Sequence, residues 1–257
     1  MNILMIGNSF SVDVSTYVHE IAKASGHDVN IYVLYIGGCP IIRHYQNMLS
    51  GEKAYEFYVN GSRTPLMWCS IQEGLKYTKY DYITFQQVST DSGNYDSFFP
   101  ELPLLLDEVR KFSDAQFILH MTWSYAKYYE HHKYGKSPLD QDAMDQDIFH
   151  TYDEVSKKVG IPFVIPSGKA IKKARLTFGD DLNRDGYHLN ERGRTLTGYV
   201  LAYYFLGTSI DVTSFIPKGH SYDDVTPGVD KKELQTLSEI AKSVVKSVSK
   251  REKFEKN

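Results

Sequence analysis

The sequence predicts an α/β fold in which helices cover both faces of a parallel sheet. Three observations lead to this class. Short apolar runs alternate with segments of helical spacing along almost the whole chain. The runs carry few polar residues, which is typical of strands buried on both faces. The 257 residues contain 42% hydrophobic residues and no repeat or linker, so we expect one domain over residues 1–257. Strand–helix alternation implies right-handed crossovers, and therefore a three-layer α/β/α sandwich with about five parallel strands.

The elements follow this alternation in order. The apolar runs predict strands at residues 3–6, 29–35, 82–85, 116–121 and 161–165. Helical spacing of apolar residues predicts helices at 12–25, 41–49, 70–77, 100–112, 141–159, 168–178 and 191–206. A further amphipathic pattern predicts a C-terminal helix at about 230–250. Polar loops are expected at residues 125–140 and 179–190.

One segment interrupts the alternation. Tyr55, Phe57 and Val59 alternate with polar positions, and Asn60-Gly61 is a hairpin turn signal before a second short run. We therefore expect an inserted β-hairpin at about residues 52–68.

Composition excludes several classes of partner and site. The net charge of −3 gives no basic field for nucleic acid. The longest uncharged run, residues 195–210, is short of the ~20 residues that span a bilayer. No charged and apolar leader precedes the first strand, so we expect a cytoplasmic protein, or a secreted or periplasmic one if a signal has been removed. Cys39 and Cys69 could form one disulfide, but they do not form a C-x-x-C zinc motif. The oligomeric state is left open.

The first candidate functional residue is Ser9, in the stretch Gly7-Asn8-Ser9. It follows the first apolar run and precedes the first helical segment. Open α/β sheets bind ligands at this junction, outside the carboxyl ends of the strands. Capping of the helix by the serine is the alternative, and from this stretch alone it is the simpler interpretation.

The second candidate is the pair Asp185 and His188, in the loop before the long apolar helix. A nucleophilic serine needs a base, and the base needs an acceptor that fixes its tautomer. A carboxylate three residues before an imidazole can reach back to Nδ1 and leave Nε2 for a serine. The same loop begins like a calcium-binding EF-hand at Asp181, but position twelve is Arg192 instead of glutamate, so we expect no calcium site.

These blocks together resemble the SGNH (GDSL-like) hydrolases. The stretch Ile6-Gly7-Asn8-Ser9-Phe10-Ser11 resembles their nucleophile block, and Asp185-Gly186-Tyr187-His188-Leu189-Asn190 resembles their last block. Gly37-Gly38 is similar to the block whose glycine amide helps form the oxyanion hole. The resemblance implies a flavodoxin-like sandwich with Ser9 as nucleophile, His188 as base and Asp185 as acid. The backbone amides of Ser9 and Gly38 would bind the oxyanion.

One block departs from that family. Its members carry Gly-x-Asn-Asp after the third strand, with the asparagine side chain in the oxyanion hole, whereas this chain reads Gln86-Gln87-Val88-Ser89-Thr90-Asp91. The pattern resembles a bacterial branch of the superfamily. A glutamine amide can donate the same hydrogen bond, and Gln87 is the expected donor. Gln86, Ser89 and Thr90 are the alternatives.

The sequence therefore predicts a serine esterase for short acyl esters, with O-acetyl groups on carbohydrate as the expected substrate. No metal or organic cofactor is expected. Trp123 and Tyr125 are the candidate substrate-binding aromatics, since such rings pack on sugars. Further aromatics in the same two regions are Tyr55, Tyr58, Tyr128 and Tyr129. The alternative is that these aromatics only pack the hairpin on the domain. A thioesterase or lysophospholipase would use the same triad, and a catalytically inactive carbohydrate-binding module is the alternative from another class.

Overall fold

Strand β1 (Asn2–Gly7) lies in the middle of the central sheet, as expected for a strand with buried residues on both faces. The computed structural model describes residues 1–217 and 229–254. Within these residues the sheet has seven strands in the order β4-β3-β2-β1-β5-β6-β7. The other strands are β2 (Asn30–Tyr35), β3 (Tyr55–Val59), β4 (Ser62–Cys69), β5 (Tyr82–Phe85), β6 (Gln116–His120) and β7 (Val164–Ile165).

The predicted α/β class is confirmed, but the sheet is mixed and larger than predicted. Strands β2, β1, β5, β6 and β7 pair in parallel. The predicted hairpin is present as β3–β4, and it extends the sheet because β3 pairs antiparallel with β2. An isolated hairpin is only marginally stable. The free edge of β2 supplies the missing backbone partners, as in the bond from the Asn60 amide to the Ile31 carbonyl (2.8 Å).

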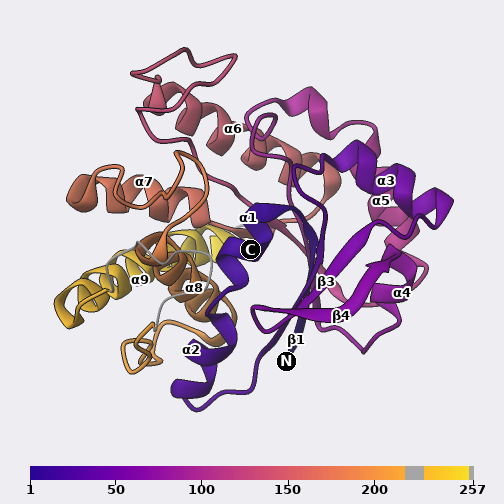
Figure 1. Ribbon diagram of the computed structural model, residues 1–257, viewed down its shortest axis with the longest axis horizontal. Helices are drawn as coiled ribbons and strands as arrows, with labels where there is room; N and C mark the ends of the chain where they lie inside the picture. The colour runs from indigo at the N-terminus through magenta and orange to yellow at the C-terminus, as the bar shows by residue number, and fades with distance from the viewer. Residues whose placement is uncertain (218–228, 255–257) are drawn as a thin grey trace.

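Helices form a layer on each side of the sheet (Figure 1). One layer contains α1 (Ser9–Ser15), α2 (Val18–Ala24), α7 (Ser167–Phe178), α8 (Glu191–Leu206) and α9 (Lys231–Phe254). The other contains α3 (Ile41–Ser50), α4 (Ile71–Leu75) and α5 (Glu101–Arg110). Helix α6 (Gln141–Val159) packs against α7 and the 3₁₀ helix η1 (Tyr95–Phe98). Across residues 1–217 and 229–254, every helix is too short or too polar to cross a bilayer.

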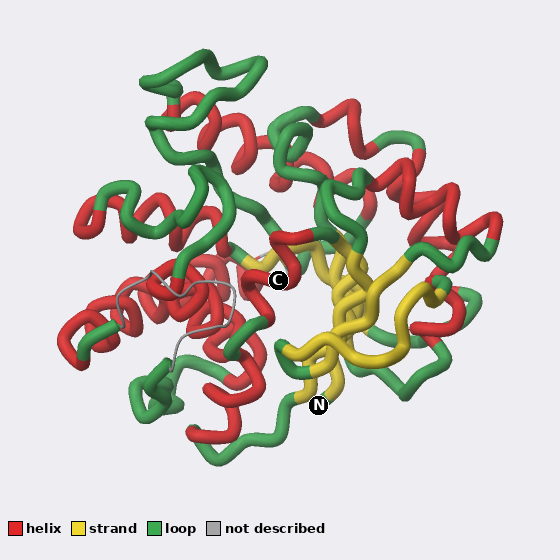
Figure 2. The backbone as a smooth tube through the Cα atoms, in the orientation of Figure 1, coloured by secondary structure: helices red, strands yellow, loops and turns green. Residues whose placement is uncertain are grey.

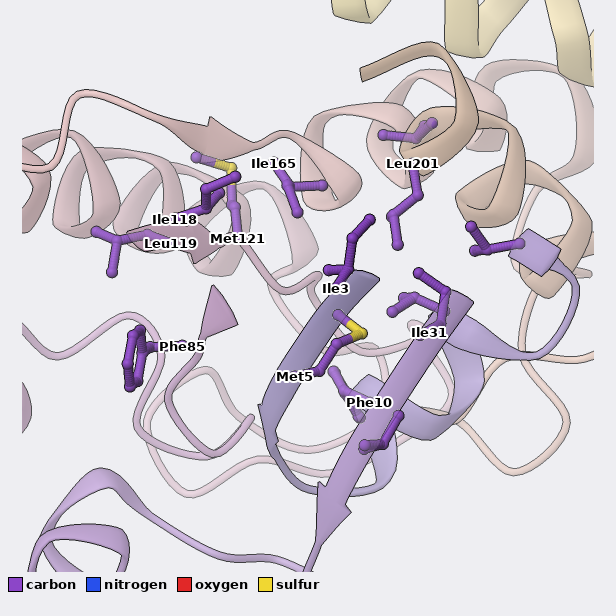
Figure 3. Close-up of a cluster of buried hydrophobic side chains, with 14 of the residues drawn as sticks. Ile3, Met5, Phe10, Ile31, Phe85, Ile118, Leu119, Met121, Ile165 and Leu201 are labelled. Carbon is purple, nitrogen blue, oxygen red and sulfur yellow. The ribbon is translucent and has the colours of Figure 1, made fainter. Parts of the chain in front are cut away.

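The core lies between the sheet and these helices. Ile3, Met5 and Ile31 from the two central strands are essentially inaccessible to solvent, as is Leu201 of α8. Figure 3 draws part of this cluster, in which Leu201 lies above Ile3. Burial of each such side chain contributes about 1.5–3 kcal/mol to stability. This packing fixes the direction in which the parallel strands point.

The carboxyl ends of the parallel strands all lie at the same edge of the sheet. The loop after β1 leads directly into α1, and longer loops follow β5 and β6 (Figure 2). The loop at residues 179–190, before α8, reaches α1, because Leu189 and Asp13 are hydrogen-bonded. The candidate residues therefore meet at this edge.

Candidate active site

Ser9 is the first residue of α1, immediately after β1. Asn8 caps this helix, because its Oδ1 accepts a hydrogen bond from the Phe10 amide (3.1 Å). The capping role that the sequence left open for Ser9 thus belongs to Asn8. Gly7 permits the sharp turn, since a Cβ at this position would lie 2.1 Å from Ser11 Oγ. The hydroxyl of the half-buried Ser9 remains free to point towards the loop at residues 179–190.

The structure brings Ser9, His188 and Asp185 together. His188 Nε2 lies 2.8 Å from Ser9 Oγ, and His188 Nδ1 lies 2.7 Å from Asp185 Oδ2. An ionised carboxylate only accepts, so Nδ1 carries the proton and Nε2 accepts from the serine hydroxyl. The distances fall within the range for proton transfer from a serine to a base. Ser9 and Asp185 are 176 positions apart (185 − 9).

Two backbone N–H groups that the sequence proposes for the oxyanion hole, those of Ser9 and Gly38, make no hydrogen bond within the described residues. Gly38 is exposed and has a φ of +60°, a conformation that favours glycine. Both groups are therefore available to an incoming oxygen.

The expected oxyanion donor Gln87 is engaged elsewhere, which corrects that prediction. Its Nε2 donates to the carbonyl (2.7 Å) and hydroxyl (3.1 Å) of Ser97, and its Oε1 accepts from the amides of Ile41 and Val88. The buried carboxamide thus ties its own loop to η1 and to the start of α3 and has no N–H left for a ligand. The alternative Ser89 is hydrogen-bonded to the Tyr125 hydroxyl (2.8 Å).

A series of buried, hydrogen-bonded polar side chains begins at Asn8, next to Ser9, and was not predicted from the sequence. Gln86 Nε2 donates to Asn8 Oδ1 (2.7 Å), and Gln86 Oε1 lies 2.8 Å from His120 Nδ1. His120 Nε2 in turn lies 2.9 Å from Ser167 Oγ. Burial lowers the pKa of His120 to about 3, so the ring is neutral and donates from one nitrogen only. The series connects residues that follow or end β1, β5, β6 and β7. The sequence feature that could have indicated this series is the polar residue at or just after the end of each of these strands.

Trp123 and Tyr125 are buried and do not form a surface for a sugar, which corrects a second prediction. Trp123 is 0% exposed, stacks on Phe10 at 4.1 Å between ring centroids, and donates from Nε1 to the Tyr187 carbonyl. Tyr125 is 4% exposed, and burial raises the pKa of its phenol to about 12. Tyr128 is 55% exposed, and its pKa is raised by burial and by the charges of Asp180 and Asp185. Tyr128 is thus an exposed aromatic whose phenol pKa is raised by burial and in part by the charge of Asp185.

The acidic and cysteine residues of the chain form no metal site in the described ranges. Asp181 pairs with Arg192, the residue at the twelfth position of the calcium-like loop. Both cysteines are buried and free, so the disulfide that the sequence left open does not form. Burial raises the pKa of Cys39 to about 12, so its thiol stays protonated.

The fold resembles that of known α/β proteins. A proposed SGNH hydrolase from Slackia heliotrinireducens superposes with a TM-score of 0.52 and 21% identity, over 79% of this chain and 97% of that one. A proposed GDSL-like lipase from Parabacteroides merdae ATCC 43184 gives 0.50 and 13%, over 77% and 91%. At these identities the likeness concerns the fold alone. It is an α/β fold with a mixed central sheet and flanking helices, resembling SGNH hydrolases.

The chain belongs to the DUF4886 family, a domain of unknown function, whose sequence profile matches residues 2–224. A crystal structure of a DUF4886 family protein from Bacteroides uniformis ATCC 8492 is 32% identical, with a TM-score of 0.83 over 95% of this chain and 94% of that one. No curated protein matches the chain.

Proposed function

We propose that the protein is a serine hydrolase of SGNH type that cleaves short acyl esters. The observation that carries this proposal is the hydrogen-bonded series from Ser9 Oγ through His188 to Asp185, with both distances below 3 Å. A serine that only caps a helix does not require a hydrogen bond to an imidazole that a carboxylate orients. The fold likeness to a proposed SGNH hydrolase and a proposed GDSL-like lipase supports the same class.

The geometry suggests the following reaction. His188 Nε2 takes the proton of Ser9 Oγ as the oxygen attacks the ester carbonyl. The amides of Ser9 and Gly38 bind the oxyanion of the tetrahedral intermediate, where loss of a single donor typically costs about a hundredfold or more in rate. The protonated His188 then gives its proton to the leaving alcohol. Water attacks the acyl group on Ser9, again with His188 as base, and releases the acid.

Asp185 keeps His188 in the required tautomer. Burial would raise the pKa of its carboxyl, but the hydrogen bonds from the side chain and backbone of His188 outweigh this effect and lower it. The carboxylate is therefore ionised wherever the imidazole can act as a base, and it stabilises the imidazolium that forms during each proton transfer.

The test is hydrolysis of a p-nitrophenyl ester series of increasing chain length by the wild type, Ser9→Ala and Ser11→Ala. We expect Ser9→Ala to lose at least about 10³-fold in kcat. Ser11 is a matched control, because it is a buried serine on the same helix whose hydroxyl has no partner among the described residues. A phosphonofluoridate should add its mass to wild type and Ser11→Ala only. Absence of labelling would indicate a binding module without an activated serine.

For the alcohol of the substrate we propose an O-acetylated carbohydrate. The support is the exposed ring of Tyr128, whose phenol pKa is raised by burial and in part by the charge of Asp185, since an aromatic face with a polar tip suits a sugar. Acetate release from acetylated xylan should exceed turnover of a C8 ester, and Tyr128→Ala should lower the first without lowering hydrolysis of p-nitrophenyl acetate. Preference for the C8 ester would favour a lysophospholipase, and preference for acyl-CoA would favour a thioesterase.

A further inference from the structure

Asp13 is a buried carboxylate on the helix that carries Ser9. It lies four residues after Ser9, so the two side chains share one face of α1, one turn apart. The residue is 1% exposed. A carboxylate this deeply buried requires several hydrogen-bond and charge partners, and these partners show what the residue does.

Two partners of Asp13, Arg184 and Leu189, come from the loop that carries His188, and a third, Arg194, lies in α8. Asp13 Oδ2 accepts a hydrogen bond from the backbone amide of Leu189 at 2.8 Å, and Leu189 directly follows His188. Asp13 Oδ1 accepts from Arg184 Nη1 at 2.9 Å and from Arg194 Nε at 3.0 Å. The same Arg184 Nη1 also donates to the Leu189 carbonyl. Both polar backbone atoms of Leu189 are thus held, one by Asp13 itself and one through Arg184.

The two consecutive residues His188 and Leu189 therefore meet two consecutive turns of one helix face. His188 contacts Ser9 through its ring, and Leu189 contacts Asp13 through its backbone. Asp185 orients the imidazole ring, but within the described part of the chain its hydrogen bonds go only to residues of its own loop and not to α1. Besides the contact of His188 with Ser9, the hydrogen bonds that join the loop to the helix of the serine are made by Asp13.

We propose that Asp13 is a positioning residue that holds His188 at reacting distance from Ser9. The inference rests on the proposed function and adds to it a second carboxylate, which acts on the backbone next to the base and not on its ring. Displacement of a reacting group by about 1 Å can cost about a hundredfold in rate. Loss of the Asp13 contacts should therefore lower the rate of the chemical step and leave binding of a small ester unchanged.

The test compares wild type, Ser9→Ala, Asp13→Asn and Tyr203→Phe with p-nitrophenyl acetate. Asp13→Asn keeps the shape but removes the charge that holds both arginines. We expect kcat to fall by about 10- to 100-fold with KM within about twofold, and phosphonofluoridate labelling of Ser9 to slow in parallel. Hydrogen exchange of the Leu189 amide should become faster. Tyr203→Phe is the control for lost stability alone, because it removes a buried 2.7 Å hydrogen bond to Ser238 between α8 and α9.

Two further comparisons keep the outcomes distinct. If Asp13→Asn does not fold, Arg184→Met replaces it, since the partly exposed Arg184 provides the link to the Leu189 carbonyl. Its kcat should fall by about fivefold or more, at unchanged KM. Wild-type kcat in the folded variant, together with an inactive Ser9→Ala, would overturn the role of Asp13 alone. A wild type that neither hydrolyses the ester nor reacts at Ser9 would overturn the proposed function and this inference together.

Discussion

Asp185 makes three contacts to two neighbouring residues of its own loop. Its Oδ2 accepts from His188 Nδ1, while its Oδ1 accepts from the backbone amides of His188 (2.9 Å) and Tyr187 (3.3 Å). One carboxylate thus fixes both the imidazole ring and the turn that presents it. Because these bonds favour the charged form, the lowered pKa of Asp185 and the fixed ring have the same origin.

Substitution Asp185→Asn should lower kcat by about 10³- to 10⁴-fold, because an amide can stabilise the wrong imidazole tautomer and no longer balances the imidazolium. Asp181→Asn is the matched control, since Asp181 is an exposed carboxylate of the same loop that pairs with Arg192. Steady-state kinetics with p-nitrophenyl acetate measure both variants. Equal activity of wild type and Asp185→Asn would remove Asp185 from the mechanism.

Single residues differ in how far their roles could be predicted. Ser9, Asp185 and His188 stand in short blocks whose local pattern is enough to propose them, and the structure places them in contact. Gln87, Trp123 and Tyr125 were expected at the site from residue type and position, but whether a side chain is buried depends on elements far along the chain. Asp13 could not be found, because an aspartate in an amphipathic helix usually faces solvent. Its partners lie more than 170 residues away.

At the scale of elements, the loop at residues 179–190 is tied to the first turn of α8. Asn190 caps this helix by accepting from the Gly193 amide (3.1 Å), and the Asn190 amide donates to the Leu182 carbonyl (3.0 Å). Gly193 allows the close approach, since a Cβ there would lie 2.4 Å from the Leu182 oxygen. The position of the loop that carries His188 therefore requires that residue 193, in the next helix, has no Cβ.

Gly193→Ala should destabilise the protein and lower kcat, because the clash is with backbone and must move the loop. Gly198→Ala in the same helix is the matched control. A Cβ there meets only the end of the Ile21 side chain at 2.7 Å, which can rotate away. Alanine also gains about 1 kcal/mol over glycine in a helix interior, so Gly198→Ala should be near neutral. Thermal melts and esterase assays compare the two, and equal effects would contradict this account.

Most element positions could be predicted because apolar periodicity is local. The helix expected at residues 12–25 is instead two helices, α1 and α2. The break lies where the hairpin turn packs, since a Cβ on Gly61 would lie 2.5 Å from the Thr16 carbonyl oxygen. Strand β7 has only two residues although five apolar ones suggested more. Strand pairing and the contact of Gly61 with Thr16 join residues far apart in the sequence. The local spacing of apolar residues therefore does not predict them.

At the scale of the whole molecule, two histidines are buried in the neutral form. Burial lowers the pKa of His44 and of His120 to about 3. His44 is 1% exposed, and its Nδ1 lies 2.9 Å from the Tyr55 hydroxyl. In the unfolded chain both would titrate near pH 6.5. Between these two pKa values the unfolded state binds protons that the folded state does not, so stability rises with pH in this window.

These two histidines should therefore contribute a fall of about 2.5 kcal/mol in the free energy of unfolding between pH 5.5 and 4.5, at about 1.4 kcal/mol per histidine and pH unit at most. Denaturant titrations at these two pH values measure it. His44→Phe keeps a ring that can stack on Tyr55 and should roughly halve the slope. Replacement of the exposed His150 is the control. An unchanged slope in His44→Phe would mean that His44 is charged in the folded protein.

Ser9 lies near the start of the chain, whereas Asp185 and His188 come 176 and 179 positions later. During synthesis the serine leaves the ribosome long before its base is made. A nascent chain or fragment that stops before residue 185 therefore carries a serine of ordinary reactivity. Under the proposed function, the reactive hydroxyl can arise only after the loop at residues 179–190 has folded back onto α1, so products that stop before this loop cannot hydrolyse esters by this route.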